Sequence, residues 1–362
     1  MTSNSAAFDG PSRALQRNLV LACAAIIFCV PLVQPGQYII HLLIMCLMWS
    51  YIYTSWSIMG RLGLVSFGHG AFLGVGAYTG VLLWNYLGIS PWLGALAAVA
   101  VTALLAVLIG YPCFRLKIVG HYFALVTLAL SEVVRLIIIG LRDYTGGSLG
   151  MTPRTALAQG QEFALGAMQF SDKRVWLYLI LVCWLLALYI WHRVDRSMAR
   201  LALQAISEQE EAAASIGINV RAVKLGLMVL SATMTCLGGV LYAQYQLYVN
   251  PENLSGIGVS LQMVFGVVAG GMFVMLGPTT GAVFLLLLSE GLRLLIGNDL
   301  HGLDIAIYGA LLVIFIIFMP KGILGTLLHR YDAYAQKRRA KEDTHAGASA
   351  APGALSVLEP RP

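Results

Sequence analysis

The chain has 362 residues, of which 59% are apolar and 11% are charged, and its formal net charge is +6. An ordinary soluble domain contains about 25% charged residues, and a soluble protein of this length cannot enclose so much apolar surface in its interior. The composition therefore excludes a soluble globular protein and indicates a lipid bilayer as the surrounding solvent. The basic excess then concerns membrane orientation and gives no sign of nucleic-acid binding.

Apolar runs predict an all-α integral membrane protein, a polytopic bundle of about ten transmembrane helices. The first run follows Arg13 and Arg17, as in a signal peptide, but no small-x-small cleavage site follows it. A second apolar run begins almost at once, so we interpret the first as a retained helix. The predicted spans are residues 18–34, 38–58, 64–87, 91–113, 120–141, 175–192, 223–247, 256–276, 278–297 and 303–319.

Lysine and arginine are distributed unevenly between the two sides of these spans. Seventeen of the 23 basic residues fall on the side that holds the N-terminus, four on the other side and two inside spans. Because basic residues stay in the cytoplasm, both termini are predicted there. The expected organisation is a cytoplasmic tail, 1–17, one transmembrane domain, 18–325, and a disordered cytoplasmic tail, 326–362.

The third predicted span is unusually rich in glycine. Small residues four positions apart let helix backbones approach closely, so packing is the first interpretation. The alternative is a broken helix whose free backbone amides meet a solute. The glycines with this spacing, here and in later spans, are Gly70, Gly74, Gly76, Gly80, Gly266, Gly270, Gly277 and Gly281.

Polar side chains accompany these glycines at membrane depth. Ser66, His69, Tyr78 and Thr79 are therefore candidates for the lining of a translocation pathway. For His69 the alternative is a structural histidine with satisfied hydrogen bonds. No second histidine, cysteine or acid stands beside it at metal-ligand spacing, so no metal site is predicted.

Two spans contain an acid and a base three residues apart. Glu132 and Arg135 share one helix face, and so do Glu290 and Arg293. A charge within the membrane is costly, and a neighbour of opposite sign reduces that cost. The pairs are either structural or line a polar pathway.

Motifs of catalysis are missing from the sequence. It has no P-loop, because none of its lysines follows a glycine, and it has no HExxH or GxSxG. The six cysteines lie in or beside apolar runs without a CxxC pair and are interpreted as small buried side chains. We therefore expect no enzyme activity, cofactor or metal in this chain.

The charged segment 193–221 predicts a short helix outside the membrane, over residues 208–216. Ser207 and Glu210 have the spacing of a capping box. Gly217 and Asn219 are stop signals. The helix dipole favours acidic side chains in the first turn, where Glu208, Glu210 and Glu211 stand.

This predicted helix has a small apolar stripe. Ala213 and Ile216 lie on it, and Ile206 continues it backwards. Such a stripe suits docking into a groove of another protein. A solvated surface helix is the other interpretation.

The segment that contains this helix resembles a known superfamily. Residues 211–217, EAAASIG, resemble the EAAxxxG signature of ABC importer permeases, without the I-x-L-P continuation of the sugar and phosphate permeases. Residues 65–79, VSFGHGAFLGVGAYT, resemble the branched-chain amino acid permeases of the LivM type. Further motifs follow in that family's order, namely RLALQAISEQEEAAASIGINV, GGVLYA, GG, GP and MPKGILG, and the resemblance covers about residues 40–325.

The resemblance implies the permease subunit of an ATP-driven importer in a bacterial plasma (inner) membrane. Its solute would be leucine, isoleucine or valine, or, as in some relatives, urea, amides or aromatic acids. Its implied partners are cytoplasmic ABC ATPase subunits, a sister permease of the LivH type in a heterodimer, and a periplasmic solute-binding protein. The residues implied in ATPase coupling are Ser207, Glu208, Glu210, Glu211, Ala212, Ala213 and Gly217.

Two further points stay open from the sequence. The polar stretch 142–173 lies outside the cytoplasm in the predicted topology and either meets the solute-binding protein or is a plain connection. The alternative of another class is an autonomous channel or secondary transporter, with the Glu–Arg pairs as relay or gate.

Overall fold

The computed structural model describes residues 11–33, 36–118, 120–156, 163–196, 202, 205, 206, 209–296, 309, 310, 313 and 322–327. The α-helices are α1 Pro11–Cys29, α2 Gln37–Gly60, α3 His69–Leu87, α4 Pro91–Arg115, α5 His121–Gly140, α6 Arg142–Thr145, α7 Lys173–Arg196, α9 Glu210–Ser215, α10 Val220–Gln246, α11 Pro251–Leu254, α12 Ile257–Gly270 and α13 Gly277–Ile296. Short 3-10 turns are η2 Val30–Val33, η3 Gly147–Leu149 and η4 Leu165–Ala167, and a small hairpin joins β1 Phe163–Ala164 to β2 Gln169–Phe170.

The helices confirm an all-α polytopic membrane protein. In the described part of the chain, six helical stretches are long and apolar enough to cross a bilayer: α2, α4, α5, α7, α10 and residues 251–270. The first nine predicted spans each coincide with a helix. The tenth, 303–319, lies almost entirely outside the described residues.

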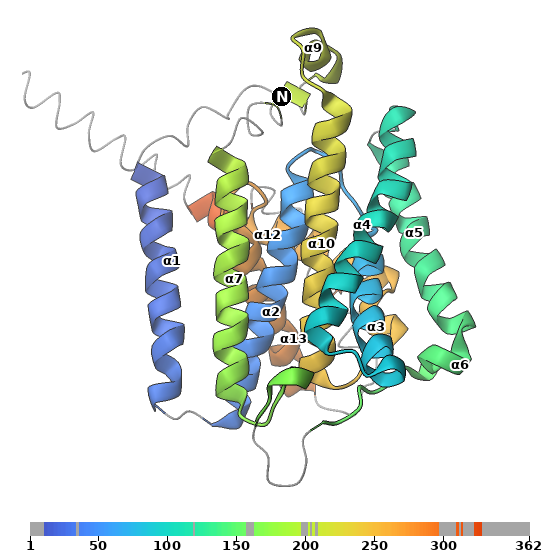
Figure 1. The fold of residues 1–362 in the computed structure, drawn as a ribbon. Helices are drawn as coiled ribbons and strands as arrows, with labels where there is room; N and C mark the ends of the chain where they lie inside the picture. Colours follow the sequence, from blue (N-terminus) through green and yellow to red (C-terminus); the bar gives the residue numbers. More distant parts are fainter. Residues whose placement is uncertain are drawn as a thin grey trace, which may run out of the picture.

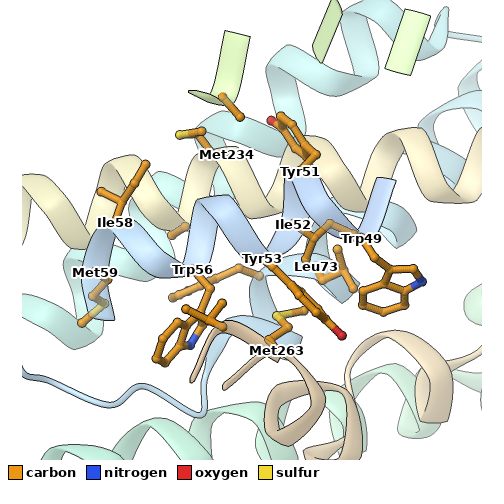
Figure 2. Close-up of a cluster of buried hydrophobic side chains, with 14 of the residues drawn as sticks. Trp49, Tyr51, Ile52, Tyr53, Trp56, Ile58, Met59, Leu73, Met234 and Met263 are labelled. Atoms are coloured by element: carbon orange, nitrogen blue, oxygen red, sulfur yellow. The ribbon is translucent and has the colours of Figure 1, made fainter. Parts of the chain in front are cut away.

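Helices α2, α3 and α10 form the centre of the bundle. α3 packs against α10, α4 and α5, whereas α2 packs against α7, α10 and α13. Figure 2 shows aromatic side chains of α2 gathered against α3, α10 and α12, and Trp56, Tyr53 and Met263 are fully buried there. α1 lies at the edge of the bundle beside α7 (Figure 1).

The outer surface of α4 is apolar from its first turn to Pro112, and only the final residue, Arg115, is charged. Its exposed side chains include Leu93, Leu96, Leu104 and Leu108. Exposed aromatic rings gather at one end of the bundle, on the last turn of α3, the first turn of α4 and α6, and they are Tyr86, Trp92 and Tyr144. Aliphatic surface bounded by such rings is typical of a helix that faces lipid.

Two predicted spans differ from the observed helices. The third begins at His69 and not at residue 64, because Gly63 has a positive φ of 73° and the segment after it bonds elsewhere. Trp56 Nε1 donates to the carbonyl oxygen of Ser66, and the amide of Phe67 donates to Thr127 Oγ1. The eighth, 256–276, ends early, since α12 stops at Gly270 and Gly271 has a positive φ of 113°. A short helix that was not predicted, α11, precedes α12 and is separated from it by Ser255 and Gly256.

Close backbone contact between α3 and α10 requires glycine. A β-carbon on Gly76 would overlap the carbonyl oxygen of Cys236, whereas one on Gly80 would meet only Val240 methyl groups, at 3.6 and 3.7 Å. The first neighbour is backbone and cannot move aside. The second is an ordinary van der Waals contact.

We expect Gly76→Ala to lower the free energy of unfolding by about 1–3 kcal/mol, the usual cost of overpacking. Gly80→Ala is the matched control in the same helix, since both variants share the gain in helix propensity. Thermal unfolding of the two purified variants in detergent compares them. Equal midpoints would show that the α3–α10 contact tolerates a side chain.

Candidate functional site

Helix α9 projects from one end of the bundle, next to the start of α10 (Figure 1). Its predicted apolar stripe is divided between interior and solvent. Ala213 and Ile206 are buried, but 74% of Ile216 is exposed. Ala212 and Ala214 are exposed as well. A small apolar surface on α9 is therefore free in the isolated chain.

The start of α9 differs from the prediction. Its N-cap residue is Gln209, without a side-chain hydrogen bond, and the helix begins at Glu210. The predicted capping box is therefore wrong for this helix. Ser207 and Glu208 lie outside the described residues.

Glu210 serves another purpose than capping. Lys224 Nζ on α10 donates to Glu210 Oε2 at 2.5 Å, and only 4% of the lysine side chain is exposed. Because the pair is largely shielded from water, it fastens α9 to α10 more firmly than a surface pair would. Sequence reasoning missed it, since the partner lies beyond the helix end.

The end of α9 agrees with the predicted stop signals. Gly217 has a φ of 90°, and its amide donates to the carbonyl oxygen of Ala214. Asn219 begins the next helix, where its Oδ1 accepts from the amide of Ala222. The turn between α9 and α10 is thus only a few residues long and leaves little freedom between the two helices.

Glu211 points away from the bundle. Its carboxylate Oε1 lies 3.8 Å from Lys117 Nζ, and both side chains are more than 70% exposed. A pair this exposed contributes little to stability. Glu211 is thus available to a partner.

An ion pair joins α2 and α7 at the same end. Arg61 pairs with Asp195, and its guanidinium lies 4.3 Å above the ring of Trp191. Lys117–Glu211 and Lys224–Glu210 join α9 to the end of α4 and the start of α10, and Arg61–Asp195 joins the ends of α2 and α7 to each other.

The polar residues of the third predicted span are inside the bundle. His69 is fully buried, with Nε2 at 2.7 Å from Ser231 Oγ and Nδ1 at 3.1 Å from Ser66 Oγ. Ser231 donates its one hydroxyl proton to the carbonyl oxygen of Ser55, so it accepts from His69 Nε2–H. The Nε2 nitrogen of the imidazole therefore carries a proton, and Nδ1 lies beside Ser66 Oγ.

This geometry favours the structural interpretation of His69. Ser66 and Tyr78 are also buried, and the Tyr78 hydroxyl donates to the carbonyl oxygen of Val249 at 3.4 Å. Thr79 is half-buried. Ser66, His69 and Tyr78 are thus buried and bonded to neighbouring segments in this arrangement, and their place in a translocation pathway stays a prediction.

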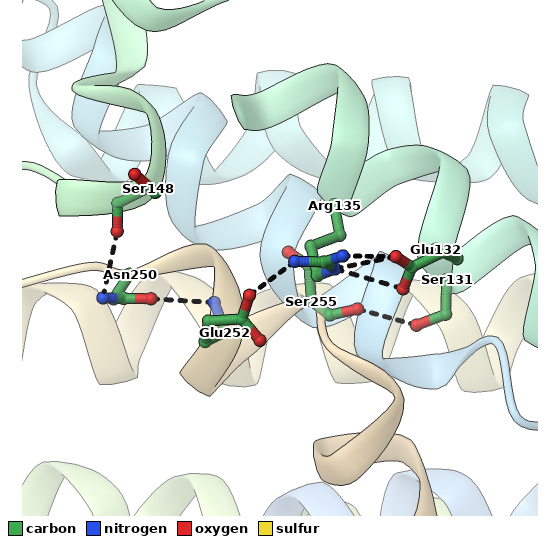
Figure 3. A network of polar contacts seen from close by, with 7 residues as sticks. All are labelled: Ser131, Glu132, Arg135, Ser148, Asn250, Glu252 and Ser255. Carbon is green, nitrogen blue, oxygen red and sulfur yellow. Dashed lines mark hydrogen bonds and ion pairs between the residues drawn. The ribbon is translucent and has the colours of Figure 1, made fainter. Parts of the chain in front are cut away.

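The first predicted charge pair is present and has a third member. Arg135 Nε lies 3.1 Å from both carboxylate oxygens of Glu132, and Arg135 Nη1 lies 2.5 Å from Glu252 on α11 (Figure 3). The amide of Glu252 donates to Asn250 Oδ1 at 2.8 Å. Asn250 followed by Pro251 and Glu252 is a helix-start signature, from which the sequence alone could have predicted α11.

A second set of bonds joins α5 to the break between α11 and α12, and α3 to α12. Ser131 Oγ donates to the carbonyl oxygen of Ser255 at 2.7 Å, and the amide of Gly70 donates to Ser260 Oγ at 3.0 Å. The Arg135–Glu252 ion pair therefore fastens α11, and the Ser131 hydroxyl fastens the break at Ser255 (Figure 3). The Ser260 hydroxyl fastens α12.

The second predicted charge pair is described only in part. Glu290 Oε2 accepts from the Tyr38 hydroxyl at 3.2 Å. The side chain of Arg293 lies outside what the structure describes. Among the described residues, no group of three histidine, cysteine or acidic side chains is placed to hold a metal ion.

A polar pocket of about 250 Å³ lies between the end of α10 and α11. None of its lining side chains carries a charge: two are phenols, three are amides and one is a leucine. They are Tyr242, Gln246, Tyr248, Asn250, Asn253 and Leu254. Hydropathy misses this pocket, because its residues span the end of one apolar run and the polar connection to the next.

Long apolar helices, a broken polar span inside the bundle and a short charged helix outside it are the construction of a membrane transport protein. The chain belongs to the family described as branched-chain amino acid transport system / permease component, whose sequence model matches residues 38–319. It is therefore a multi-pass membrane protein and a permease component, which is a transport subunit and not a catalytic enzyme.

Two curated relatives carry the name high-affinity branched-chain amino acid transport system permease protein LivM. They come from Escherichia coli K12 and Salmonella typhimurium LT2, and each is 31% identical over 285 residues. The match covers 74% of this chain and 65% of either relative, so the chain spans slightly less than two thirds of their length. No solved structure matches the chain.

Proposed function

We propose that the protein is the transmembrane permease subunit of an ATP-driven ABC importer for branched-chain amino acids or a related small solute. The family and the names of both relatives support the transport of leucine, isoleucine and valine. Other solutes considered from the sequence are urea, amides and aromatic acids. ATP is hydrolysed by partner subunits.

The observation that carries the proposal is the exposed and fastened α9. Glu211 and Ile216 face solvent, while Glu210 is bound to α10 through a shielded ion pair. A coupling element needs both properties, since one side has to meet an ATPase and the other has to pass its movement to the membrane helices. Ala212, Ala213 and Gly217 complete this element in the proposal.

The charge distribution supports a cytoplasmic α9 and cytoplasmic termini in the plasma membrane. Basic residues stand at the ends of α2, α4 and α7 and the start of α10, all on the α9 side: Arg61, Arg115, Lys117, Arg193, Arg196, Arg221 and Lys224. The opposite end holds fewer: Arg142, Arg154, Lys173 and Arg174. The difference follows the positive-inside rule.

On the opposite, periplasmic side, the stretch 142–173 is the proposed contact for a solute-binding protein. It is tied to the helices, since Trp84 Nε1 donates to the carbonyl oxygen of Arg154 at 2.8 Å and Trp92 Nε1 to that of Leu165 at 2.7 Å. A surface fixed in this way suits recognition better than a free loop does. A sister permease completes the proposed heterodimer.

The test is reconstitution of the chain in proteoliposomes with its sister permease, its ATPase subunits and its binding protein. Uptake of radiolabelled leucine is expected only with ATP inside and with every subunit present. The control is the chain alone, with a leucine gradient and no ATP. Leucine flux through the chain alone would favour an autonomous channel or secondary transporter and overturn the proposal.

A further inference from the structure

The polar pocket beside α11 lies deep within the bundle. Val249 accepts from Tyr78, which stands nine residues before the end of α3, so at 1.5 Å per residue it is about 14 Å from that end. Gln246 lies 3.7 Å from the sulfur of Met45, eight residues after the start of α2 and about 12 Å from it. The pocket is thus well inside the roughly 30 Å of membrane hydrocarbon.

The depth is confirmed by the aromatic rings at the same end of the bundle. Tyr86 and Trp92 stand at the last turn of α3 and the first turn of α4, and both are exposed. Such rings settle at the membrane–water boundary. The polar stretch 142–173 also reaches into the bundle at this depth, because Met151 and Val249 exchange two backbone hydrogen bonds of 2.9 Å.

The surface around the pocket is not suited to lipid. Tyr248 is 42% exposed, and the carboxylate side chain of Glu252 is 61% exposed. Asn253 is exposed too. Polar and charged side chains exposed to hydrocarbon are costly even when they have one partner, so this surface faces water, solute or another subunit. The aliphatic face of α4 shows what lipid contact looks like in the same chain.

The lining has a definite chemistry. Amides and phenols both donate and accept hydrogen bonds. Tyr248 and Asn250 already bond to Leu149, Ser148 and Glu252, so Tyr242, Gln246 and Asn253 are the groups that a solute would meet. The charged residues nearby, Arg135 and Glu252, are bound to each other outside the pocket. A solute with both an ammonium and a carboxylate group can be held by such groups without an ion pair. Weak, uncharged contacts also allow release, which conduction requires.

We propose that this pocket binds the solute about midway through the membrane. The pocket takes small solutes that carry both an ammonium and a carboxylate group and have no net charge. The inference rests on the proposed function, of which it names the solute-contacting residues. Gln246 and Asn253 hydrogen-bond the polar groups, and Leu254 contacts the apolar part. The 250 Å³ volume is below the usual range of drug-sized sites, about 300–1,000 Å³, and fits a single amino acid.

The position of the pocket also links it to α9. Tyr242 and Gln246 belong to the last turns of α10, and Lys224 in the second turn of α10 holds Glu210. One helix thus connects the proposed ATPase contact to the proposed solute contact. Movement of α10 changes the pocket directly.

The experiment measures leucine uptake by the reconstituted complex with Asn253→Leu, Gln246→Leu and Tyr242→Phe. Each loses one or two hydrogen bonds, and a bond of about 0.5–1.5 kcal/mol corresponds to a rate loss of about 2- to 10-fold. Asn253→Asp adds a negative charge and is expected to impair uptake further. Tyr122→Phe is the matched control, because this phenol is 75% exposed on α5 and does not line the pocket.

Protection from labelling gives a second readout that does not depend on turnover. Asn253→Cys is expected to react with a water-soluble maleimide, and millimolar leucine is expected to slow this reaction in the complex. Tyr122→Cys serves as the site outside the pocket, and the native chain gives the background of its six cysteines.

The two levels of inference fail separately. If the unaltered complex shows no ATP-dependent uptake, the proposed function falls. If it takes up leucine but the pocket variants match Tyr122→Phe and leucine gives Asn253→Cys no protection, the pocket assignment is wrong and the importer stands.

Discussion

Replacing Glu211 with lysine is expected to reduce ATP-dependent uptake by about tenfold or more while the chain still folds. The side chain is 84% exposed, and its pairing with Lys117 is too exposed to matter for stability. In the proposed complex, however, reversal of charge at a docking site sets like charges against each other, which costs several kcal/mol, roughly. Gly217→Asp is expected to have the same effect, because a φ of 90° strains any residue with a β-carbon.

The matched control for Glu211→Lys is Lys117→Met, which breaks the same weak ion pair without changing α9. Its uptake is expected to stay near that of the unaltered chain. Binding of the purified ATPase subunits to each variant separates loss of docking from loss of transport. If Glu211→Lys binds the ATPase and takes up leucine normally, α9 is not the coupling element.

Replacing Arg135 with leucine is expected to destabilise the membrane domain by about 2 kcal/mol or more. It removes the one guanidinium that neutralises both Glu132 and Glu252, and a single charge at membrane depth costs about 2.5–3.5 kcal/mol. Partial exposure of the three side chains keeps the loss toward the lower end. The thermal unfolding midpoint in detergent measures it.

Removing the charges together tests the reason for that loss. The combined variant Glu132→Gln, Arg135→Leu and Glu252→Gln leaves no unpaired ion and is expected to recover most of the lost stability. If the combined variant unfolds as early as Arg135→Leu alone, the guanidinium contributes through packing and not through charge.

Hydropathy predicted most helices well, because each helix is a continuous apolar run that one window of sequence contains. It placed nine spans on observed helices, but it missed α11 and the break at Ser255 and Gly256 that separates it from α12. The break depends on what surrounds it, since Gly74 leaves room for Ser255 and Ser131 binds its carbonyl group. A window of sequence does not contain these neighbours.

Pairs within one helix were also predictable, and pairs between helices were not. Glu132 and Arg135 are three residues apart and meet as expected, whereas Glu252 is 117 residues from its arginine. The same limit applies to Lys224 and Glu210, which face each other across a turn. The pocket lining was hidden for this reason too, because its amides come together only when α10 and α11 are in place.

The crossing of α3 and α10 gives the bundle a pivot. Backbone touches backbone there, at Gly76 against Cys236 and at Gly239 against Leu73, so α10 cannot slide along α3 without separating from it. Cys236 stands almost midway between Lys224 and Gln246 along the 27-residue helix. If α10 tilts as a rigid body about this contact, its two ends move in opposite directions by similar amounts, and a displacement at the α9 end is passed on to the pocket.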